Sequence, residues 1–423
     1  MTPAFALLRH PWPGVACNLM QIHDFNCQYI MYKYPISICI LLFFLLISLG
    51  EVNAVAQEIY TPEVGKCVRP KMKTLAKEQR DGYKCRYVEL SVEEDERVKA
   101  YLLVPDKASW TEKCPAVVML HDHGARFDIG KEKLVRPMSS ALPDEEDDHI
   151  MKSSRQWIDK NFDGVYLADS LASLGYVVLV ADAMYWGERS HEDAQRWSEL
   201  TYGDISNASC LKDRRLEGKA LKDTIRILKN RVYDGQKVLY DSLYSDGVIW
   251  AEKMLRDDVA SVRLLRGLSY VDKGNIGAFG FSMGAHRCWM LAAFCKEVKC
   301  GVALSWMTSL DKEERMKPSD FSMAVMPMRE QLDFGDIGMF LAPKPMLFLN
   351  GTEDHLFPKA KVESAFRKLQ KHYTDHNDRL SEDGAVATEP AFEPLQTVFF
   401  NGGHHCGKDV QPSIVRFFND NLN

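Results

Sequence analysis

The run Gly280–Gly284, with the sequence GFSMG, offers the clearest chemistry in the chain. It follows the apolar residues 276–279 and precedes a helical stretch, and a G-x-S-x-G sequence between a strand and a helix is typical of a nucleophile elbow. The glycines allow a strained turn that projects the hydroxyl of Ser282, because larger side chains would collide with the neighbouring strand and helix. We therefore expect Ser282 to act as a nucleophile rather than to be part of a structural turn.

A serine becomes a good nucleophile only when a base accepts its proton and an acid orients that base. In the fold that uses this elbow, the chain order is serine, then acid, then histidine. Asp354 lies in a loop after one apolar run, and His404 follows another apolar run just before the last helix, so these two are the expected acid and base. Glu353 remains an alternative acid, and His405 remains an alternative base.

Acyl transfer at a serine also needs N–H donors for the oxyanion that develops. The residue after the nucleophile, Met283, is expected to supply one donor from the start of the helix. The loop after the first parallel strand supplies the second, and it reads HDHGA at residues 121–125. Because glycine permits close backbone approach, we expect the second donor to come from Gly124 or Ala125.

The same loop has a second possible interpretation. His121, Asp122 and His123 are residue types that bind metals. No distant group of ligands has metal-site spacing, however, and the chain contains no C-x-x-C pair. Since the hydrolytic groups are complete without a metal, we expect neither a metal nor a cofactor.

The elements that position these residues read as an alternation of strands and helices. Short, fully apolar runs are typical of strands buried on both faces of a parallel sheet. Residues 251–265 and 410–418 show the three-and-four spacing of amphipathic helices. The expected class is therefore α/β, with a mostly parallel, doubly wound sheet and an antiparallel hairpin before it. The expected parallel strands are Ala116–Leu120, Tyr176–Ala181, Ile276–Phe281, Val302–Trp306, Met346–Leu349 and Thr397–Phe400, and the hairpin is Cys85–Val92 with Val98–Val104.

The domain prediction divides the chain into three parts. Residues 1–56 form a leader and signal peptide, 57–84 an N-terminal extension and 85–423 the catalytic domain. Two insertions near 186–247 and 307–340 interrupt the alternation after strands. Since ligands bind outside the carboxyl ends of strands in open α/β sheets, these insertions are expected to shape the substrate cleft.

The leader prediction rests on the apolar run Ile36–Leu49, which has a basic residue before it and Ala54–Ala56 after it. This pattern is typical of a secretory signal peptide, and the run is shorter than the roughly 20 apolar residues of a membrane-spanning helix. We expect cleavage between Ala56 and Gln57, and a secreted or periplasmic mature protein that meets the membrane only through its leader. An uncleaved anchor is the alternative, and Met31 could be the true start.

Composition excludes some other classes of protein. The 423 residues carry a formal net charge of −6, whereas nucleic-acid binding needs a basic surface. Of the 11 cysteines, Cys67 and Cys85 lie close enough in sequence for a local disulfide. Cys288, Cys295 and Cys300 are expected to be small buried apolar residues.

Three motifs together resemble the acetyl xylan esterase and dienelactone hydrolase branch of the α/β-hydrolase superfamily. They are HDHG at 121–124 with GKEK at 130–133, Asp182 with GER at 187–189, and the run 275–284. The resemblance covers roughly residues 85–423. It implies an α/β-hydrolase fold and an exported carbohydrate esterase that removes acetyl or methyl esters from plant polysaccharides. In one departure from the expected pattern, His404 and His405 stand where a single histidine belongs.

The function expected from these observations is a secreted serine esterase working through an acyl-enzyme on a small ester or a polysaccharide-derived substrate. An exported serine peptidase of the same fold and a non-catalytic carbohydrate-binding protein are the alternatives, and the oligomeric state stays open. Four cations near strand ends could contact anionic sugars and favour a uronate ester, or could pair with the acidic surface. They are Arg126, Lys131, Lys133 and Arg189.

Overall fold

The computed structural model describes residues 59–64, 70–93, 96–138, 144–202, 217–310, 321–382 and 393–423, with only the backbone of 144–148 and 379–382. The predicted leader and Cys67 lie outside these residues. In the described part of the chain, no helix has both the length and the hydrophobicity needed to cross a bilayer.

The described strands form one nine-stranded sheet in the order β1-β2-β3-β5-β4-β6-β7-β8-β9. β1, β2 and β3 pair antiparallel, and β3 also runs antiparallel to β5, whereas the remaining pairs from β5 to β9 are parallel. The strands are β1 Met72–Arg80, β2 Tyr83–Ser91, β3 Arg97–Pro105, β4 Cys114–Leu120, β5 Val177–Ala181, β6 Val271–Phe281, β7 Cys300–Leu304, β8 Met346–Gly351 and β9 Leu395–Phe400.

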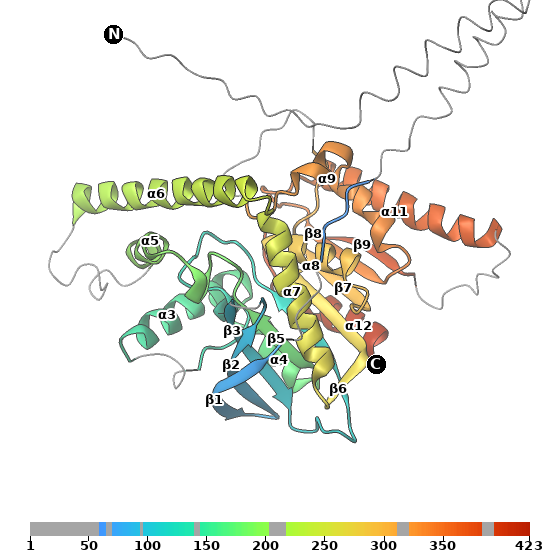
Figure 1. Cartoon of the computed structure of the whole chain (residues 1–423), viewed down its shortest axis with the longest axis horizontal. Helices are drawn as coiled ribbons and strands as arrows, with labels where there is room; N and C mark the ends of the chain where they lie inside the picture. Colours follow the sequence, from blue (N-terminus) through green and yellow to red (C-terminus); the bar gives the residue numbers. More distant parts are fainter. Residues whose placement is uncertain are drawn as a thin grey trace, which may run out of the picture. The chain divides into compact units, whose positions relative to one another are not determined.

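Helices connect the parallel strands and lie on both faces of the sheet (Figure 1). The long helix α6 lies beside α5. The α-helices are α3 Asp144–Asn161, α4 Leu167–Ser173, α5 Glu192–Tyr202, α6 Gly218–Ser245, α7 Trp250–Gly267, α8 Met283–Phe294, α9 Met326–Gln331, α10 Gly338–Leu341, α11 Lys359–Glu382 and α12 Gln411–Leu422. Short 3-10 helices are η1 Lys131–Lys133, η3 Gly187–Arg189 and η6 Phe334–Ile337.

Two hydrophobic cores, one on each face, explain why the strands are apolar throughout. In β4, Val118 packs into the core that α7, α8 and α11 cover, whereas Val117 and Met119 pack into the core that α4 and α12 cover. Successive side chains of a strand point to opposite faces, so a strand covered on both sides needs apolar residues at every position. The predicted doubly wound sheet is therefore confirmed.

All six predicted parallel strands are present, as β4 to β9, and the predicted hairpin is β2 and β3. Trp306 lies beyond the end of β7 rather than within it. The strand β1 was not predicted, and it falls within the residues assigned to an N-terminal extension. It pairs with β2 along its whole length, so residues 72–80 belong to the sheet.

The cysteine predictions have different outcomes. Cys288, Cys295 and Cys300 are buried with free thiols, as expected. Cys85 is also free and fully buried in the core, whereas Cys67, considered above as a disulfide partner, lies outside the described residues. Cys85 lies in β2, and its side chain packs into one of the two cores of the sheet.

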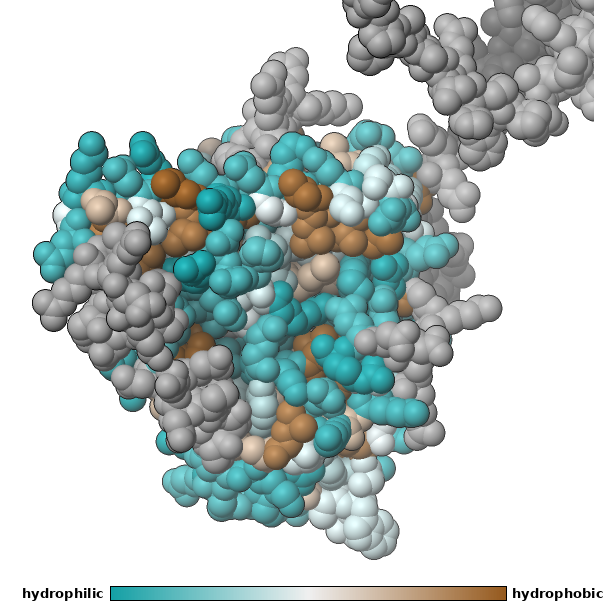
Figure 2. Space-filling view, turned by 60° about the vertical axis from the view of Figure 1, so that its left-hand side comes forward, coloured by the Kyte–Doolittle hydropathy of each residue, from teal (hydrophilic) through white to brown (hydrophobic). Residues whose placement is uncertain are grey.

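The surface contains scattered apolar residues rather than only polar ones. On the face that Figure 2 shows, hydrophobic patches are separated by hydrophilic residues. Among the large hydrophobic side chains of the described residues, Trp110 is the most exposed, at 78%, in the turn between β3 and β4. Single exposed apolar residues of this kind are normal in globular proteins. These exposed apolar residues therefore do not by themselves indicate a binding site.

Candidate active site

Ser282 occupies a sharp turn between β6, which ends at Phe281, and α8, which begins at Met283. Its backbone has φ 54° and ψ −124°, a strained conformation for a residue with a side chain. A Cβ on Gly280 would lie 1.8 Å from the Gly284 oxygen, and a Cβ on Gly284 would lie 1.9 Å from the Leu120 oxygen. Both glycines are therefore required, and the predicted elbow geometry is present.

Backbone hydrogen bonds hold this turn in place. The Ser282 N–H donates to the Leu304 oxygen over 2.8 Å, which ties the turn to the end of β7. The Ser282 oxygen accepts the N–H of Ala285 at 2.7 Å, which closes the first turn of α8. The first N–H groups of a helix have no acceptor within the helix, so the Met283 N–H is available for an anion at this position.

His404 and Asp354 lie close together although 50 residues separate them. His404 Nδ1 is 2.8 Å from Asp354 Oδ2. Because an ionised carboxylate can only accept, Nδ1 carries the hydrogen and Nε2 is the basic nitrogen. The N–H groups of Leu356 and Phe357 donate to the other oxygen, Oδ1, at 2.9 and 3.2 Å, so the carboxylate is fixed from both sides.

Aromatic packing also fixes the His404 ring. Its centroid lies 4.9 Å from that of Phe281, and the ring stacks on Phe357 at 5.9 Å. The Asp354 side chain is completely buried, whereas the imidazole keeps 15% of its surface exposed. The Asp354 carboxylate is therefore shielded from water, whereas the His404 ring, bonded through Nδ1, stays partly accessible to solvent.

The alternative acid and base lie elsewhere. Glu353 is exposed, and the structure places no bond between its carboxylate and His404. His405 turns toward α12, where its Nε2 lies 3.0 Å from Asp409 Oδ1. Its ring packs edge-on against Phe400. Of the two histidines, His404 is the one that the structure brings together with Asp354.

Ser282 and His404 line the same cleft, which encloses about 1670 Å³ including the solvent at its mouth. One wall comes from the loop after β4 and from α3, and the other comes from residues 306–310, 323–334 and 355–361. The lining is apolar and aromatic with a few polar groups, as is usual for ligand sites. Residues of the two walls include Asp122, Gly124, Trp157, Asn161, Trp306, Thr308, Met323, Arg329, Phe334, His355 and Lys361.

The loop after β4 adopts an unusual backbone at its tip. Gly124 has φ 57° and Ala125 has φ 51°. The Ala125 N–H donates to His123 Nδ1 over 3.0 Å, so it is already engaged. A Cβ at Gly124 would lie 2.3 Å from Trp157. Of the two predicted donors in this loop, the geometry therefore favours Gly124.

Of the three possible metal ligands in this loop, His121 and His123 accept hydrogen bonds from the protein, whereas both carboxylate oxygens of Asp122 are buried without a hydrogen-bond partner among the described residues. His121 Nε2 accepts the N–H of Ala183 at 3.0 Å, and its Nδ1 lies 2.9 Å from the Asp122 oxygen. Burial, together with the charge of Lys133, lowers the pKa of His123 to about 3. Within the described ranges, no group of three or more His, Cys, Asp or Glu residues could hold a metal ion.

The four cations considered for anionic sugars are turned inward. Lys131 and Lys133 are at most 1% exposed, and Arg126 is 3% exposed. Among the described residues that line the cleft, none is one of these four. The hypothesis that they contact the substrate is therefore wrong, and pairing with the protein's own carboxylates is observed. The partners are Asp128 for Arg126, Asp182, Glu132 and Glu188 for Lys131, Asp122 for Lys133, and Asp257 and Glu96 for Arg189.

The two insertions contribute unequally to the cleft. The second, 307–340, supplies Thr308, Met323, Arg329 and other lining residues, as predicted. The described part of the first insertion, 186–247, supplies no lining residue. It packs instead against the loop after β4, where Trp197 contacts Phe127 with ring centroids 5.6 Å apart.

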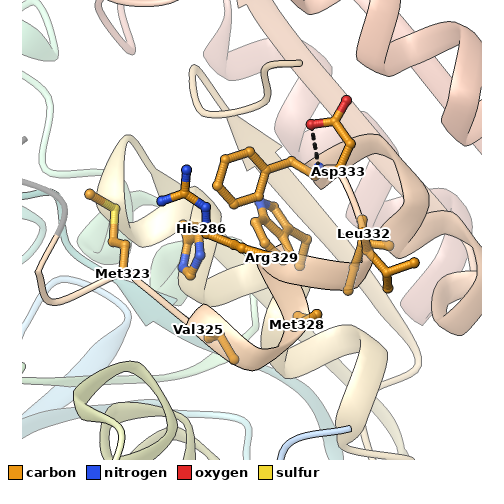
Figure 3. A pocket seen from close by; sticks show the side chains of 10 residues that line it. His286, Met323, Val325, Met328, Arg329, Leu332 and Asp333 are labelled. Carbon is orange, nitrogen blue, oxygen red and sulfur yellow. Dashed lines mark hydrogen bonds between the residues drawn. The ribbon is translucent and has the colours of Figure 1, made fainter. Parts of the chain in front are cut away.

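A smaller side cavity adjoins the cleft and shares Met323, Arg329 and Phe334 with it. Figure 3 shows Arg329 next to His286, a histidine of α8 that is only 2% exposed. Burial, and then the charge of Arg329, lowers the pKa of His286 to about 3, so this imidazole is neutral. Neither residue lies in a motif that the sequence offers as a site.

Comparison with known proteins shows the family to which the chain belongs. A family model described as the Dienelactone hydrolase family matches residues 155–380, more than half of the chain. The match includes Ser282 and Asp354, and His404 lies beyond it. The curated protein named "Putative hydrolase YtaP" from Bacillus subtilis (strain 168) is 26% identical over 349 residues, covering 82% of this chain and 91% of that protein.

Some solved structures are similar to this chain, and the first described here shares its fold. A glucuronoyl esterase from Solibacter usitatus matches with a TM-score of 0.51 and 10% identity, covering 86% of this chain and 88% of that one. Acetyl xylan esterase 1 from Thermoanaerobacterium sp. JW/SL YS485 matches with a TM-score of 0.45 and 12% identity, covering 85% and 88%. The sheet described above is thus the predicted α/β-hydrolase type.

Proposed function

Since the chain belongs to the Dienelactone hydrolase family and is a hydrolase, we propose that it is a serine esterase acting through an acyl-enzyme. One observation carries the proposal. Ser282, on its strained turn, lines the same cleft as His404, whose Nδ1 is hydrogen-bonded to the buried Asp354. A nucleophile, a base and an orienting acid in that arrangement suit acyl transfer.

The proposed reaction begins when Ser282 Oγ attacks the ester carbonyl carbon. The serine proton passes to His404 Nε2, and the carbonyl oxygen becomes an oxyanion. Collapse of this intermediate breaks the C–O bond, and the leaving alkoxide takes the proton from His404 as an alcohol. Water then attacks the acyl-enzyme with the same proton route, which releases a carboxylic acid and restores Ser282. Asp354 stabilises the imidazolium that forms in each half.

The oxyanion is proposed to bind two N–H groups, those of Met283 and Gly124. The Met283 N–H lies at the start of α8, where the positive end of the helix dipole also favours negative charge. Gly124 lines the same cleft as Ser282 and Met283, and the Ala125 N–H donates to His123 Nδ1. Removing one such donor typically reduces kcat by about 10²–10³-fold.

The proposed substrates are acetyl or methyl esters on plant cell-wall polysaccharide, and the proposed location is outside the cytoplasm after cleavage near Ala56. The leader pattern of residues 36–56 supports export. The fold shared with a glucuronoyl esterase supports an ester of a carbohydrate. Release of acetate from acetylated xylan, measured against release of methanol from esterified pectin, distinguishes the two ester classes.

The mechanism is tested with Ser282→Ala. Turnover of an aryl acetate is expected to fall by about 10⁵–10⁶-fold, because loss of the nucleophile removes the acyl-enzyme route. A fluorophosphonate probe should label the wild-type protein at Ser282 and leave the variant unlabelled. Near wild-type turnover by a folded Ser282→Ala protein would exclude this mechanism.

A further inference from the structure

Lys133 is a fully buried cation that the proposed reaction does not use. It is 0% exposed, and its closest carboxylate oxygen, on Asp122, is 3.7 Å away. Its ammonium instead donates to two backbone oxygens, those of Asp122 and His123, each at 2.9 Å. Burying a charge is costly, so an ammonium placed on two loop carbonyls requires a reason.

Those two carbonyls are held by further donors. The Asp122 oxygen also lies 2.9 Å from His121 Nδ1, which carries the hydrogen because Nε2 accepts the Ala183 N–H. The His123 oxygen also accepts Trp186 Nε1 at 3.0 Å. Each of these peptide groups therefore has its carbonyl fixed by two donors from inside the protein.

In a trans peptide the C=O and the following N–H point in opposite directions. The His123 carbonyl and the Gly124 N–H belong to one peptide group. With the carbonyl held by Lys133 and Trp186, the Gly124 N–H points away from both of them. Gly124 lines the cleft, whereas Lys133 and Trp186 are buried behind the loop. The fixed carbonyl thus sets the direction of the donor.

We propose that Lys133 is a positioning residue that, with Trp186, fixes the Gly124 N–H as an oxyanion donor. This inference rests on the proposed function and deepens it. The ammonium touches no reacting atom; it acts through the peptide group between His123 and Gly124. Its positive charge also lies on the side of the loop opposite the developing oxyanion, and favours that charge through the aligned peptide dipole.

The surroundings of Lys133 set its charge. Burial, with a smaller contribution from the charge of Arg126, lowers the pKa of Lys133, and the carboxylates of Asp122, Asp128 and Asp182 oppose this effect. The net result is a pKa of about 8. The ammonium also lies 5.3 Å from the centre of the Trp157 ring. Lys133 is therefore charged at neutral pH and loses its proton in mildly alkaline solution.

The test compares Lys133→Met, Lys133→Arg and Trp186→Phe in the full chain. In Lys133→Met the Gly124 N–H is no longer held in its direction. We therefore expect kcat for a neutral aryl acetate to fall by about 10–100-fold, with KM changed less than about twofold. Trp186→Phe keeps an aromatic side chain but loses the N–H donor and some buried volume, while Lys133 still holds the His123 carbonyl, so a smaller decrease of about 3–10-fold is expected. Wild-type kcat should decline above about pH 8, and Lys133→Arg, which does not titrate there, should lack that decline.

Affinity for a trifluoromethyl ketone provides a readout that a purely structural role would not change. Ser282 Oγ adds to its carbonyl carbon, the serine proton moves to His404, and the resulting hemiketal bears an oxyanion. The affinity should fall in parallel with kcat. If Lys133→Met does not fold, Trp186→Phe and Lys133→Arg decide the matter by the same readouts. Unchanged kcat and ketone affinity in folded Lys133→Met and Trp186→Phe, or an alkaline decline of kcat that persists in Lys133→Arg, would overturn the inference alone, whereas an active Ser282→Ala protein would overturn the proposed function.

Discussion

Two groups of polar residues lie at the carboxyl ends of the parallel strands, and they differ in what surrounds them. After β6 and β9, Ser282 and His404 keep part of their surface in the cleft. After β5, Asp182 is 2% exposed, and its two oxygens accept the N–H and the ammonium of Lys131, each at 2.8 Å. Ser282 and His404 therefore lie where a ligand in the cleft can reach them. The oxygens of Asp182, by contrast, are hydrogen-bonded to Lys131 inside the protein.

The comparison teaches how to interpret charged residues near strand ends. A cation or carboxylate at that edge of an α/β sheet is at a position where ligands bind. It is available to a ligand only when the protein does not already supply its partner. Lys131 has three carboxylates within 2.9 Å, from Glu132, Asp182 and Glu188. This cluster therefore stabilises the arrangement of the loops, and the cleft group is left for chemistry.

The largest expected effect lies in the cleft group and separates two adjacent histidines. His404→Ala is expected to reduce kcat/KM for an aryl acetate by about 10⁵–10⁶-fold, as loss of the base removes proton transfer. His405→Ala serves as the matched control and should stay within about twofold, because an exposed pair such as His405 with Asp409 contributes little. Steady-state kinetics with both variants measure the difference. Equal losses in the two variants would contradict the assignment.

Much of the fold follows from local patterns. The apolar runs at β4 to β9 predicted the parallel strands, because burial on both faces requires them. The strand β1, MKTLAKEQR, was missed since it is an edge strand with mostly exposed side chains and no apolar alternation. Its pairing with β2 is a backbone interaction, and local side-chain patterns do not report such pairing.

Those residues of the candidate site could be predicted that belong to a motif of fixed spacing or follow a fixed order along the chain. The elbow glycines and the order of Ser282, Asp354 and His404 follow from such rules. The choice between the histidines was open, although Asp409, four residues after His405, was a signal for the pair that forms. The partners of Lys131 could not be found this way, because Asp182 lies 51 residues away and reaches it only through tertiary structure.

The variant Lys131→Met tests whether the ion-pair cluster of Lys131 with Glu132, Asp182 and Glu188 stabilises the fold. Removing the cation leaves Asp182 and Glu132 buried without their charge partner, which is expected to destabilise the fold by about 3–5 kcal/mol. Lys237→Met is the control, since the exposed pair of Lys237 with Asp241 should contribute less than about 1 kcal/mol. Chemical denaturation measures both values. Any loss of turnover in Lys131→Met should follow the folded fraction, and a variant as stable as wild type would show that the cluster is not structural.

The smallest expected effect concerns the stability of the fold in acid, to which the buried carboxylate of Asp128 contributes. Burial raises the pKa of Asp128, but the hydrogen bond from His149 at 3.1 Å, the charge of Arg126 and the Ser153 hydroxyl together bring it below its ordinary value. The unfolded chain therefore binds a proton at a higher pH than the folded chain does, near the ordinary value of about 3.9. It follows that the stability contributed by this carboxylate is complete above about pH 4 and is lost as the pH falls toward the lowered pKa.

Asp128→Asn removes this titration. The variant is expected to be less stable at neutral pH, because Arg126 loses its partner, but its Tm should fall less steeply than that of wild type between about pH 4 and pH 2. Asp159→Asn is the control, because the Asp159 side chain is 58% exposed and its pair with Arg155 is weak. Parallel curves of Tm against pH for Asp128→Asn and wild type would show that the buried carboxylate contributes nothing to acid stability. A shallower curve would place Asp128 with the Lys131 cluster, as a charge whose partners lie inside the protein.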